Sequence, residues 1–276
     1  MDLPHCWFLA MMAPMLVQFS IKNYRSFCEP GVLSLVAVPE LDGGSKLDEN
    51  TFEAGFGLRL VKSAAIYGAN ASGKSNLLKA LAFMRSLIRK SFAEILPTGK
   101  LRTSPFRLRT DSLDQPTEFA MIWIDGGMMF RYQFVLDKNS IHEERLYRKP
   151  SASPERPGEE EELFHRVGLD VSMGSGFAEG SALPKGGFKR ENALFLSYAA
   201  QFAGPISKQI TDWIGNMIKP ISGLDDKLLG SFTASRLADK QWSDEILQLS
   251  QQADLGIAAI RAERLSGRAE EPSRDS

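Results

Sequence analysis

The sequence is poor in the residues that build disulfide frameworks and metal centres. It has two cysteines, Cys6 and Cys28, and three dispersed histidines, His5, His142 and His165. This number and setting do not suggest a disulfide scaffold or a zinc cluster. The histidines suggest neither a metal site nor a Ser-His-Asp arrangement. No catalytic residue is therefore assigned. Because the few cysteines do not suggest a disulfide framework, a reducing cytoplasm is the expected location of the protein.

Long apolar runs and an excess of one charge are also missing. No apolar stretch approaches the ~18 residues that a membrane helix needs, so no membrane association is expected. Lys and Arg number 33 against 34 Asp and Glu, and a formal net charge of −1 favours neither nucleic acid nor a membrane surface as a partner. The apolar N-terminal residues lack a basic segment, which argues against a signal peptide. Translation starts either at Met1, with residues 1–14 as an extension, or at Met15, where a strand pattern begins.

Apolar periodicity divides the first part of the chain into strands and a helix. Val17, Phe19 and Ile21 alternate with polar residues, as in a half-buried strand. Leu77, Leu81, Met84 and Ile88 recur at helical spacing. The predicted elements are strands over residues 16–21, 32–38 and 60–67, the last one buried, and an amphipathic helix over residues 74–90.

The second part of the chain changes from strand to helix patterns. Three strands joined by two short polar turns predict an antiparallel meander, in which Trp123 and Phe134 face the core. Irregular loops are expected over residues 151–162 and 174–187. The predicted strands cover residues 117–124, 128–136 and 141–148, and the predicted helices cover residues 193–202, 207–218 and 243–253. The predicted domains are an extension over residues 1–14, a head over residues 15–262 and a disordered tail over residues 263–276.

A glycine-rich segment matches a phosphate-binding loop (P-loop) at every fixed position. Residues 68–75 read GANASGKS, which fits G-x-x-x-x-G-K-[S/T], with a predicted strand before it and a predicted helix after it. The glycines let the backbone wrap phosphates, and the helix N-terminus adds partial positive charge. The alternative is a glycine-rich turn that fits the pattern by chance. The predicted nucleotide-binding residues are Gly68, Ala69, Asn70, Ala71, Ser72, Gly73, Lys74 and Ser75.

Two of these side chains have specific expected roles. Lys74 would reach the β- and γ-phosphates of the nucleotide, and the Ser75 hydroxyl would hold Mg²⁺. The expected cofactors are therefore ATP, or a close relative, and Mg²⁺. The sequence contains no Asn-Lys-x-Asp motif, which argues against a GTPase. A P-loop kinase is disfavoured because strands precede the loop and a meander follows it.

Several stretches resemble one group of P-loop proteins. Residues 19–27 (FSIKNYRSF) and 60–81 (LVKSAAIYGANASGKSNLLKAL) are similar to the N-terminal lobe of an ABC-type ATPase head. The closer resemblance is to RecF-, SMC- and OLD-like proteins, and the closest is to AAA-type ATPases associated with abortive infection. Asn70 and Asn76 fit this branch, and residues 194–202 and 221–226 resemble it too. Only the P-loop is a highly specific motif, although the similarity extends from about residue 15 to residue 257.

The resemblance implies a fold, further site residues and a partner. The implied fold class is α/β: a P-loop NTPase with an ABC-ATPase-like N-terminal lobe, an antiparallel β-meander and a C-terminal helical segment. Asn76 joins the predicted nucleotide-binding residues, and so does Arg25, because a basic residue in that turn lies near the nucleotide in the RecF and SMC branch. The alternative for Arg25 is an ordinary surface arginine.

Two motifs of a complete head are not evident. A Walker B strand should end in Asp followed by Glu, yet residues 121–125 (MIWID) are followed by glycine, and Asp244-Glu245 follows no apolar strand. Residues 265–268 (LSGR) resemble a signature motif only by coincidence. In the resembled family both motifs lie in a C-terminal lobe. We expect a homo- or hetero-oligomeric partner, or a longer natural chain, to supply that lobe.

The remaining feature is a local excess of positive charge between residues 79 and 109. It could follow a nucleic-acid backbone, although a solvated helix and loop near the triphosphate is the favoured alternative. The basic residues are Lys79, Arg85, Arg89, Lys90, Lys100, Arg102, Arg107 and Arg109. The chain as a whole is predicted to bind and hydrolyse ATP in anti-phage defence or DNA maintenance. The alternative is a truncated nucleotide-binding interaction module without turnover.

Overall fold

The structure is a computed structural model that describes residues 14–38, 50–151, 158–184, 187–202, 204–221, 227–253 and 257–262. The chain divides into one compact unit that ends at Pro220 and a second that begins at Ile221, and each is described by itself. Residues 1–13 of the predicted extension and the whole predicted tail lie outside the described ranges.

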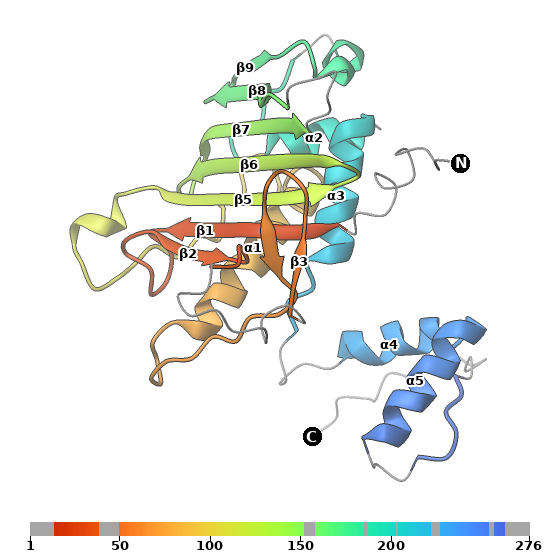
Figure 1. The fold of residues 1–276 in the computed structure, drawn as a ribbon. Helices are drawn as coiled ribbons and strands as arrows, with labels where there is room; N and C mark the ends of the chain where they lie inside the picture. The colour runs from red at the N-terminus through yellow and green to blue at the C-terminus, as the bar shows by residue number, and fades with distance from the viewer. Residues whose placement is uncertain are drawn as a thin grey trace, which may run out of the picture. The chain divides into compact units, whose positions relative to one another are not determined.

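The first unit is built on a large antiparallel sheet (Figure 1). Within the described residues its seven strands follow the order β2-β1-β5-β6-β7-β8-β9. The predicted meander is confirmed, because β5, β6 and β7 pair in sequence order through tight turns. The strands are β1 (Met15–Lys22), β2 (Gly31–Ser34), β5 (Thr117–Asp125), β6 (Met128–Leu136), β7 (Ile141–Pro150), β8 (Glu161–Val167) and β9 (Asp170–Met173).

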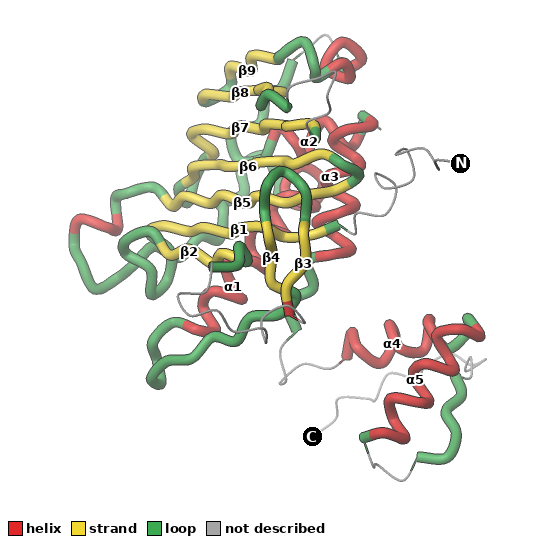
Figure 2. Tube along the Cα trace, in the orientation of Figure 1, coloured by secondary structure: helices red, strands yellow, loops and turns green. Residues whose placement is uncertain are grey.

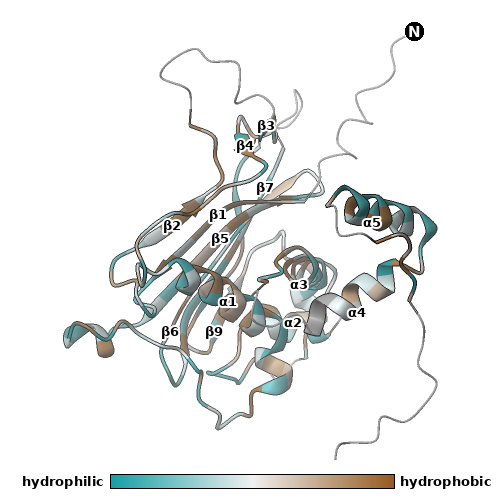
Figure 3. Ribbon diagram, turned by 90° about the horizontal axis from the view of Figure 1, so that it is seen from below, coloured by the Kyte–Doolittle hydropathy of each residue, from teal (hydrophilic) through white to brown (hydrophobic). Residues whose placement is uncertain are grey.

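Three helices cover one face of this sheet (Figures 1 and 3). They are α1 (Lys74–Glu94), α2 (Phe195–Gln201) and α3 (Pro205–Met217). Their apolar faces meet the inward residues of the strands in one core, in which the Trp123 ring stacks on Trp213 at a centroid distance of 5.2 Å. Trp123 and Phe134 are fully buried, as predicted. Burying aromatic surface of this size on both layers is the main force that holds the helices on the sheet.

A short hairpin covers part of the other face (Figure 2). It pairs β3 (Thr51–Glu53) with β4 (Arg59–Val61). Leu60 of the hairpin belongs to a second apolar cluster with Val17 of β1 and Ile124 of β5. Both sides of the sheet are therefore partly covered, which explains why Ile124 is buried although its neighbour Trp123 faces the helices.

The predicted buried strand over residues 60–67 is wrong. Strand β4 ends at Val61, and residues 62–70 are irregular and exposed, with Ile66 exposed by 48% and Tyr67 by 89%. The apolar pattern is that of a strand, but beyond the hydrogen bonds of Lys62 and Ser63 with Asn50, no described strand lies beside residues 64–67. An apolar pattern becomes a buried strand only when neighbours complete the ladder and cover the side chains.

Other predicted elements also have different boundaries in the structure. The predicted strand over residues 32–38 ends at Ser34, after which Val36 makes only an isolated bridge to Leu60. Strand β8 begins inside the loop predicted over residues 151–162, and β9 follows it. Short helical turns occur at Asp111–Leu113 and Ala178–Ala182, the second within the stretch predicted to be irregular.

A buried ion pair anchors helix α2 to the sheet. Glu144 of β7 and Arg166 of β8 are both fully buried, and their Oε2 and Nη1 atoms are 3.2 Å apart. The Glu144 carboxylate also accepts hydrogen bonds from the amides of Phe195 and Leu196 at the start of α2. It accepts a third from the Tyr132 hydroxyl, whose pKa is raised well above its ordinary value by burial and by this carboxylate. The carboxylate thus satisfies helix amides that would otherwise be buried without partners.

The second unit contains helices α4 (Lys227–Arg236) and α5 (Lys240–Gln252). Helix α5 contains most of the predicted helix over residues 243–253, whereas α4 was not predicted. The Arg236 guanidinium lies over the rings of Phe232 and Trp242, at 5.3 and 5.0 Å from their centroids. None of the described helices, in either unit, has the length and apolar character to cross a bilayer.

Candidate phosphate-binding site

The P-loop residues 68–75 form a turn that leads directly into helix α1. The helix begins at Lys74, and Gly73 caps it with φ of +103°, a left-handed conformation that glycine adopts without strain. A Cβ atom on Gly73 would lie 2.5 Å from the Ser26 Oγ, and one on Gly68 would lie 2.7 Å from the Ser72 Oγ. Gly73 is therefore favoured by both its backbone conformation and the packing against Ser26, whereas at Gly68 only the close approach of the Ser72 side chain favours glycine.

Lys74 lies where the motif predicts a phosphate ligand. Its ammonium group donates hydrogen bonds to the carbonyl oxygens of Gly68 (2.6 Å) and Ala69 (2.7 Å), so the side chain folds back across the loop. The first amides of α1 have no partners within the helix, and the helix dipole adds partial positive charge at the same place. An ammonium group and free amides at one helix start form a site for a polyphosphate.

The other predicted residues are distributed along the loop and the first turn of the helix. Ala71 has φ of +64°, and Asn70 and Ser75 are exposed. The Asn76 side-chain amide donates to the Ser26 Oγ at 3.0 Å. This hydrogen bond joins α1 to the turn after β1, so that the turn is held against the P-loop.

Arg25 belongs to this turn, as its predicted role requires. It has φ of +53°, an uncommon conformation for a residue with a long side chain. Its backbone amide donates to the Ser104 carbonyl at 2.7 Å, and its guanidinium lies 5.5 Å from the Tyr24 ring centroid. Arg25 and the P-loop residue Ser72 line the same cavity. The structure thus brings Arg25 and the P-loop together.

Two cavities flank the P-loop. One, of about 440 Å³, has apolar walls that include Leu33, Ile66 and Leu77. The other, of about 580 Å³, lies between the loop, the turn that carries Arg25 and residues 104–108. Among the residues that the structure describes, neither cavity is lined by an aspartate or a glutamate. Apart from Arg107, which belongs to the basic stretch, the sequence patterns predict no role for residues 104–108, because no motif marks them.

Asp125, the acidic residue that follows the Walker B-like apolar residues, lies away from the P-loop. Ile124 pairs with Met15 at the start of β1, whereas Glu118 pairs with Lys22 at its end, next to the turn that contacts the P-loop. Asp125 therefore lies beside the start of the eight-residue strand β1, whereas the turn that contacts the P-loop follows the end of β1, roughly 23 Å away along the strand. Its carboxylate accepts a hydrogen bond from Gln209 of α3 instead. Asp244 and Glu245 lie on α5, a helix. Residues 265–268 are outside the described ranges.

The basic stretch over residues 79–109 is partly engaged within the protein. Arg85 donates to the Gly215 carbonyl of α3 at 2.9 Å, and burial lowers its pKa. Lys90 pairs with Glu94 one helical turn later. Arg109 pairs with Asp111 and Glu29. These contacts reduce the positive charge that the stretch presents to solvent.

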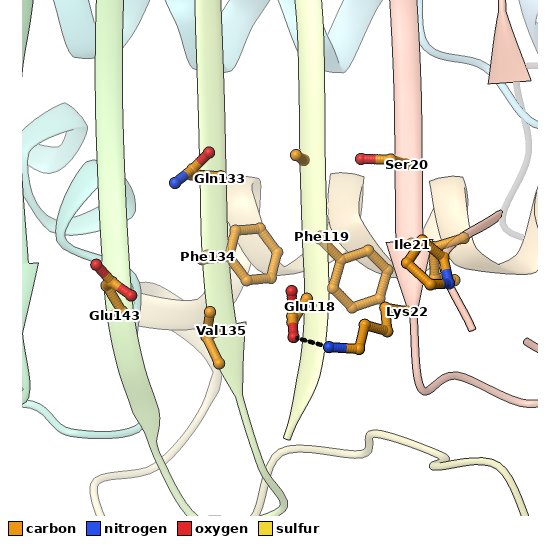
Figure 4. A pocket seen from close by; sticks show the side chains of 11 residues that line it. Ser20, Ile21, Lys22, Glu118, Phe119, Gln133, Phe134, Val135 and Glu143 are labelled. Carbon is orange, nitrogen blue, oxygen red and sulfur yellow. Dashed lines mark hydrogen bonds and ion pairs between the residues drawn. The ribbon is translucent and has the colours of Figure 1, made fainter. Parts of the chain in front are cut away.

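A shallow cavity of about 150 Å³ lies on the open face of the sheet (Figure 4). Lys22 of β1 and Glu118 of β5 form an ion pair of 2.8 Å across it, and Glu143 of β7 is held by Arg145 and His165. The charged groups there neutralise one another on neighbouring strands. This surface is a solvated sheet face rather than a phosphate site.

Comparison with known proteins agrees with this geometry. Residues 63–274, well over half of the chain, match the family described as "AAA domain, putative AbiEii toxin, Type IV TA system". The matched region begins just before the P-loop and includes α1. Comparisons with curated proteins and with solved structures found no match.

Proposed function

The chain belongs to this AAA-domain family of P-loop proteins, and we propose that it binds ATP with Mg²⁺ through residues 68–75 and hydrolyses it as part of an ABC-type head of the RecF/SMC-like class. The observation that carries the proposal is the P-loop at the start of α1, where Lys74 and the free helix amides converge. AAA-family ATPases in general use this nucleotide and metal.

The residues of the loop fit the cofactor. The exposed Ser75 hydroxyl, adjacent to Lys74 at the helix start, would hold Mg²⁺, which supplies charge neutralisation at the phosphates when bound. Lys74 would exchange its carbonyl partners for phosphate oxygens. Gly68 and Gly73 keep the backbone close enough for its amides to donate to the same oxygens.

Hydrolysis requires groups that the described walls of the two cavities do not supply. A carboxylate must orient the attacking water and complete the metal shell, yet no acidic residue among those the structure describes lines the cavities beside the loop. Lys62 and Ser63 are hydrogen-bonded to Asn50, but residues 64–67 (AAIY) run into the loop as an exposed apolar stretch with no strand beside it among the described residues. Such a stretch is suited to pair with a strand of a C-terminal lobe, which a second polypeptide or a longer natural chain would supply.

The proposed biological setting is supported by the description of the family. The family description names a toxin of a toxin–antitoxin system, which favours a role in anti-phage defence. DNA maintenance is the related setting suggested by the RecF/SMC-like resemblance. DNA contact through the basic stretch is a weaker part of the proposal, because Arg85, Lys90 and Arg109 have partners within the protein.

Binding is tested first. Titration of the chain with ATP and Mg²⁺ should saturate, and Lys74→Ala should abolish binding. Lys79→Ala is the matched control, since it removes an exposed lysine from the same helix just beyond the P-loop turn. Equal affinities of the wild type and Lys74→Ala would mean that the P-loop is not the nucleotide site.

Turnover separates the proposal from its alternative, an interaction module that binds nucleotide without hydrolysis. Phosphate release is measured for the chain alone and with the product of the adjacent downstream gene. Release that depends on that product and on Lys74 supports a split or completed head. Saturable ATP binding without release in either reaction favours the interaction module.

A further inference from the structure

The 580 Å³ cavity beside the P-loop has a wall that the motif does not include. Ser72 and Asn76 line it from the loop and from α1, and Arg25 lines it from the turn after β1. The third side is residues 104–108, which follow the P-loop by about thirty positions and are brought back to it by the fold. This wall reads Ser-Pro-Phe-Arg-Leu.

The chemistry of this cavity differs from that of the P-loop itself. Pro105 and Phe106 are half-buried, whereas Arg107 is exposed and has no hydrogen bond or ion pair with any described residue. With Arg25, the described residues that line the cavity include two arginines and no carboxylate. Guanidinium planes stack on aromatic rings and donate to ring and hydroxyl oxygens, while apolar walls exclude water. A base and ribose attached to a polyphosphate offer these complementary groups.

The wall is held in place by the buried side chain of Asn23, with help from Ser112. Asn23 is 3% exposed and has φ of +50°, a conformation that asparagine tolerates better than most residues. Its amide nitrogen donates to the carbonyls of Ser112 (2.8 Å) and Gln115 (2.7 Å), and its amide oxygen accepts from the backbone of Phe106 (3.0 Å). The Ser112 hydroxyl donates to the Phe106 carbonyl at 2.7 Å. The loop that carries Arg107 is therefore pinned to the turn after β1.

We propose that residues 104–108 form the nucleoside-binding wall of this site, with Arg107 contacting the base and ribose and Asn23 as the positioning residue. The inference rests on the proposed function, because the triphosphate must lie on the P-loop for the nucleoside to reach the wall. It assigns the affinity for the nucleoside to a segment outside the motif. The phosphates and the nucleoside are then bound by separate groups, which can be removed one at a time.

The test compares ATP with inorganic tripolyphosphate, both with Mg²⁺, on the full chain. Arg107→Ala should weaken ATP binding about tenfold, as loss of one stacking contact does, and change tripolyphosphate binding less than about twofold. Arg102→Ala, which removes an exposed arginine of the same segment outside the cavity, should change neither. An unchanged ATP affinity in Arg107→Ala, or an equal loss for both ligands, overturns the inference. A wild type that binds neither ligand refutes the proposed function instead.

The positioning role has a separate readout. Asn23→Asp keeps the acceptor for Phe106 but loses the hydrogen bonds donated to Ser112, Gln115 and Pro116. The ratio of tripolyphosphate to ATP affinity should therefore move toward that of Arg107→Ala. If Asn23→Asp does not fold, Ser112→Ala loosens the same loop from its other side and should shift the ratio in the same direction. A lower melting temperature with a wild-type ratio assigns these residues a purely structural role and overturns this part of the inference.

Discussion

Replacing Glu144 by glutamine should destabilise the first unit far more than the same change at the adjacent Glu143. Glu144 is fully buried and accepts four hydrogen bonds, from Tyr132, Arg166 and the first two amides of α2. In Glu144→Gln the Oε1 position keeps two of its donors. The new amide group then faces Arg166 and the Phe195 amide, which are both donors.

The magnitude follows from what remains around Arg166. Breaking a buried ion pair by removing one partner costs about 3–5 kcal/mol, because the other charge stays buried. Arg166 keeps the carbonyls of Gly168 and Ala193 as acceptors, which places the cost near the lower end, at about 3 kcal/mol. Glu143 is on the opposite face and its pairs with Arg145 and His165 are partly solvated, so Glu143→Gln should cost less than about 1 kcal/mol.

The assay is urea unfolding of both variants and the wild type at pH 7, followed by circular dichroism. Both substitutions remove one charge from strand β7, so the difference between their free energies of unfolding reports the effect of burying the carboxylate. Equal free energies of unfolding for the two variants would show that the Glu144–Arg166 pair does not anchor α2. An intact fold with a cost at Glu143 larger than at Glu144 would refute the reasoning outright.

Three further outcomes are expected. Glu179→Ala should lower the free energy of unfolding by about 2 kcal/mol, because this buried carboxylate accepts hydrogen bonds from the first amides of α3; urea titration measures it, and a neutral effect contradicts the capping role. Gly73→Ala should reduce ATP affinity more than tenfold, because the new Cβ atom would contact Ser26. Gly57→Ala is the control, since Gly57 also has a positive φ but has open space around it, and ATP affinity should not fall. Equal ATP affinities of the two variants would refute this prediction. The pKa of the Glu143 carboxylate is lowered from its ordinary 4.5. Burial alone would raise this pKa, but the hydrogen bonds and charges of Arg145 and His165 outweigh burial. The stability that the Glu143 carboxylate contributes is therefore present above pH 4.5 and is lost as the pH falls through the lowered pKa. The free energies of unfolding of Glu143→Gln and the wild type should converge in acid. A difference in stability that widens in acid contradicts the lowered pKa.

Local patterns were sufficient for the elements whose partners are close in sequence. The meander strands β5, β6 and β7 follow from alternation and from turns at Asp125–Met128 and Leu136–Ile141, because hairpins pair with their own neighbours. Helix α1 follows from its apolar spacing, although it continues to Glu94. The P-loop follows from fixed residue types that the backbone itself requires.

Long-range pairing decided the rest. The apolar run over residues 60–67 has the composition of a buried strand, yet residues 62–67 have no described strand beside them and stay exposed, since a ladder needs a partner that the run itself cannot specify. Burial of Glu144 and Arg166 could not be anticipated, because charged residues on a strand are ordinarily solvated.

By itself the sequence determined the phosphate-binding loop, since glycine, lysine and serine at that spacing have one dominant use. Only the tertiary structure decided what surrounds it. Arg25 and residues 104–108 come together around the loop because Asn23, a buried amide with four backbone partners, ties two distant segments to one turn. Hydrogen bonds between residues more than eighty positions apart leave no periodic trace in the sequence, which is why this wall became visible only in the fold.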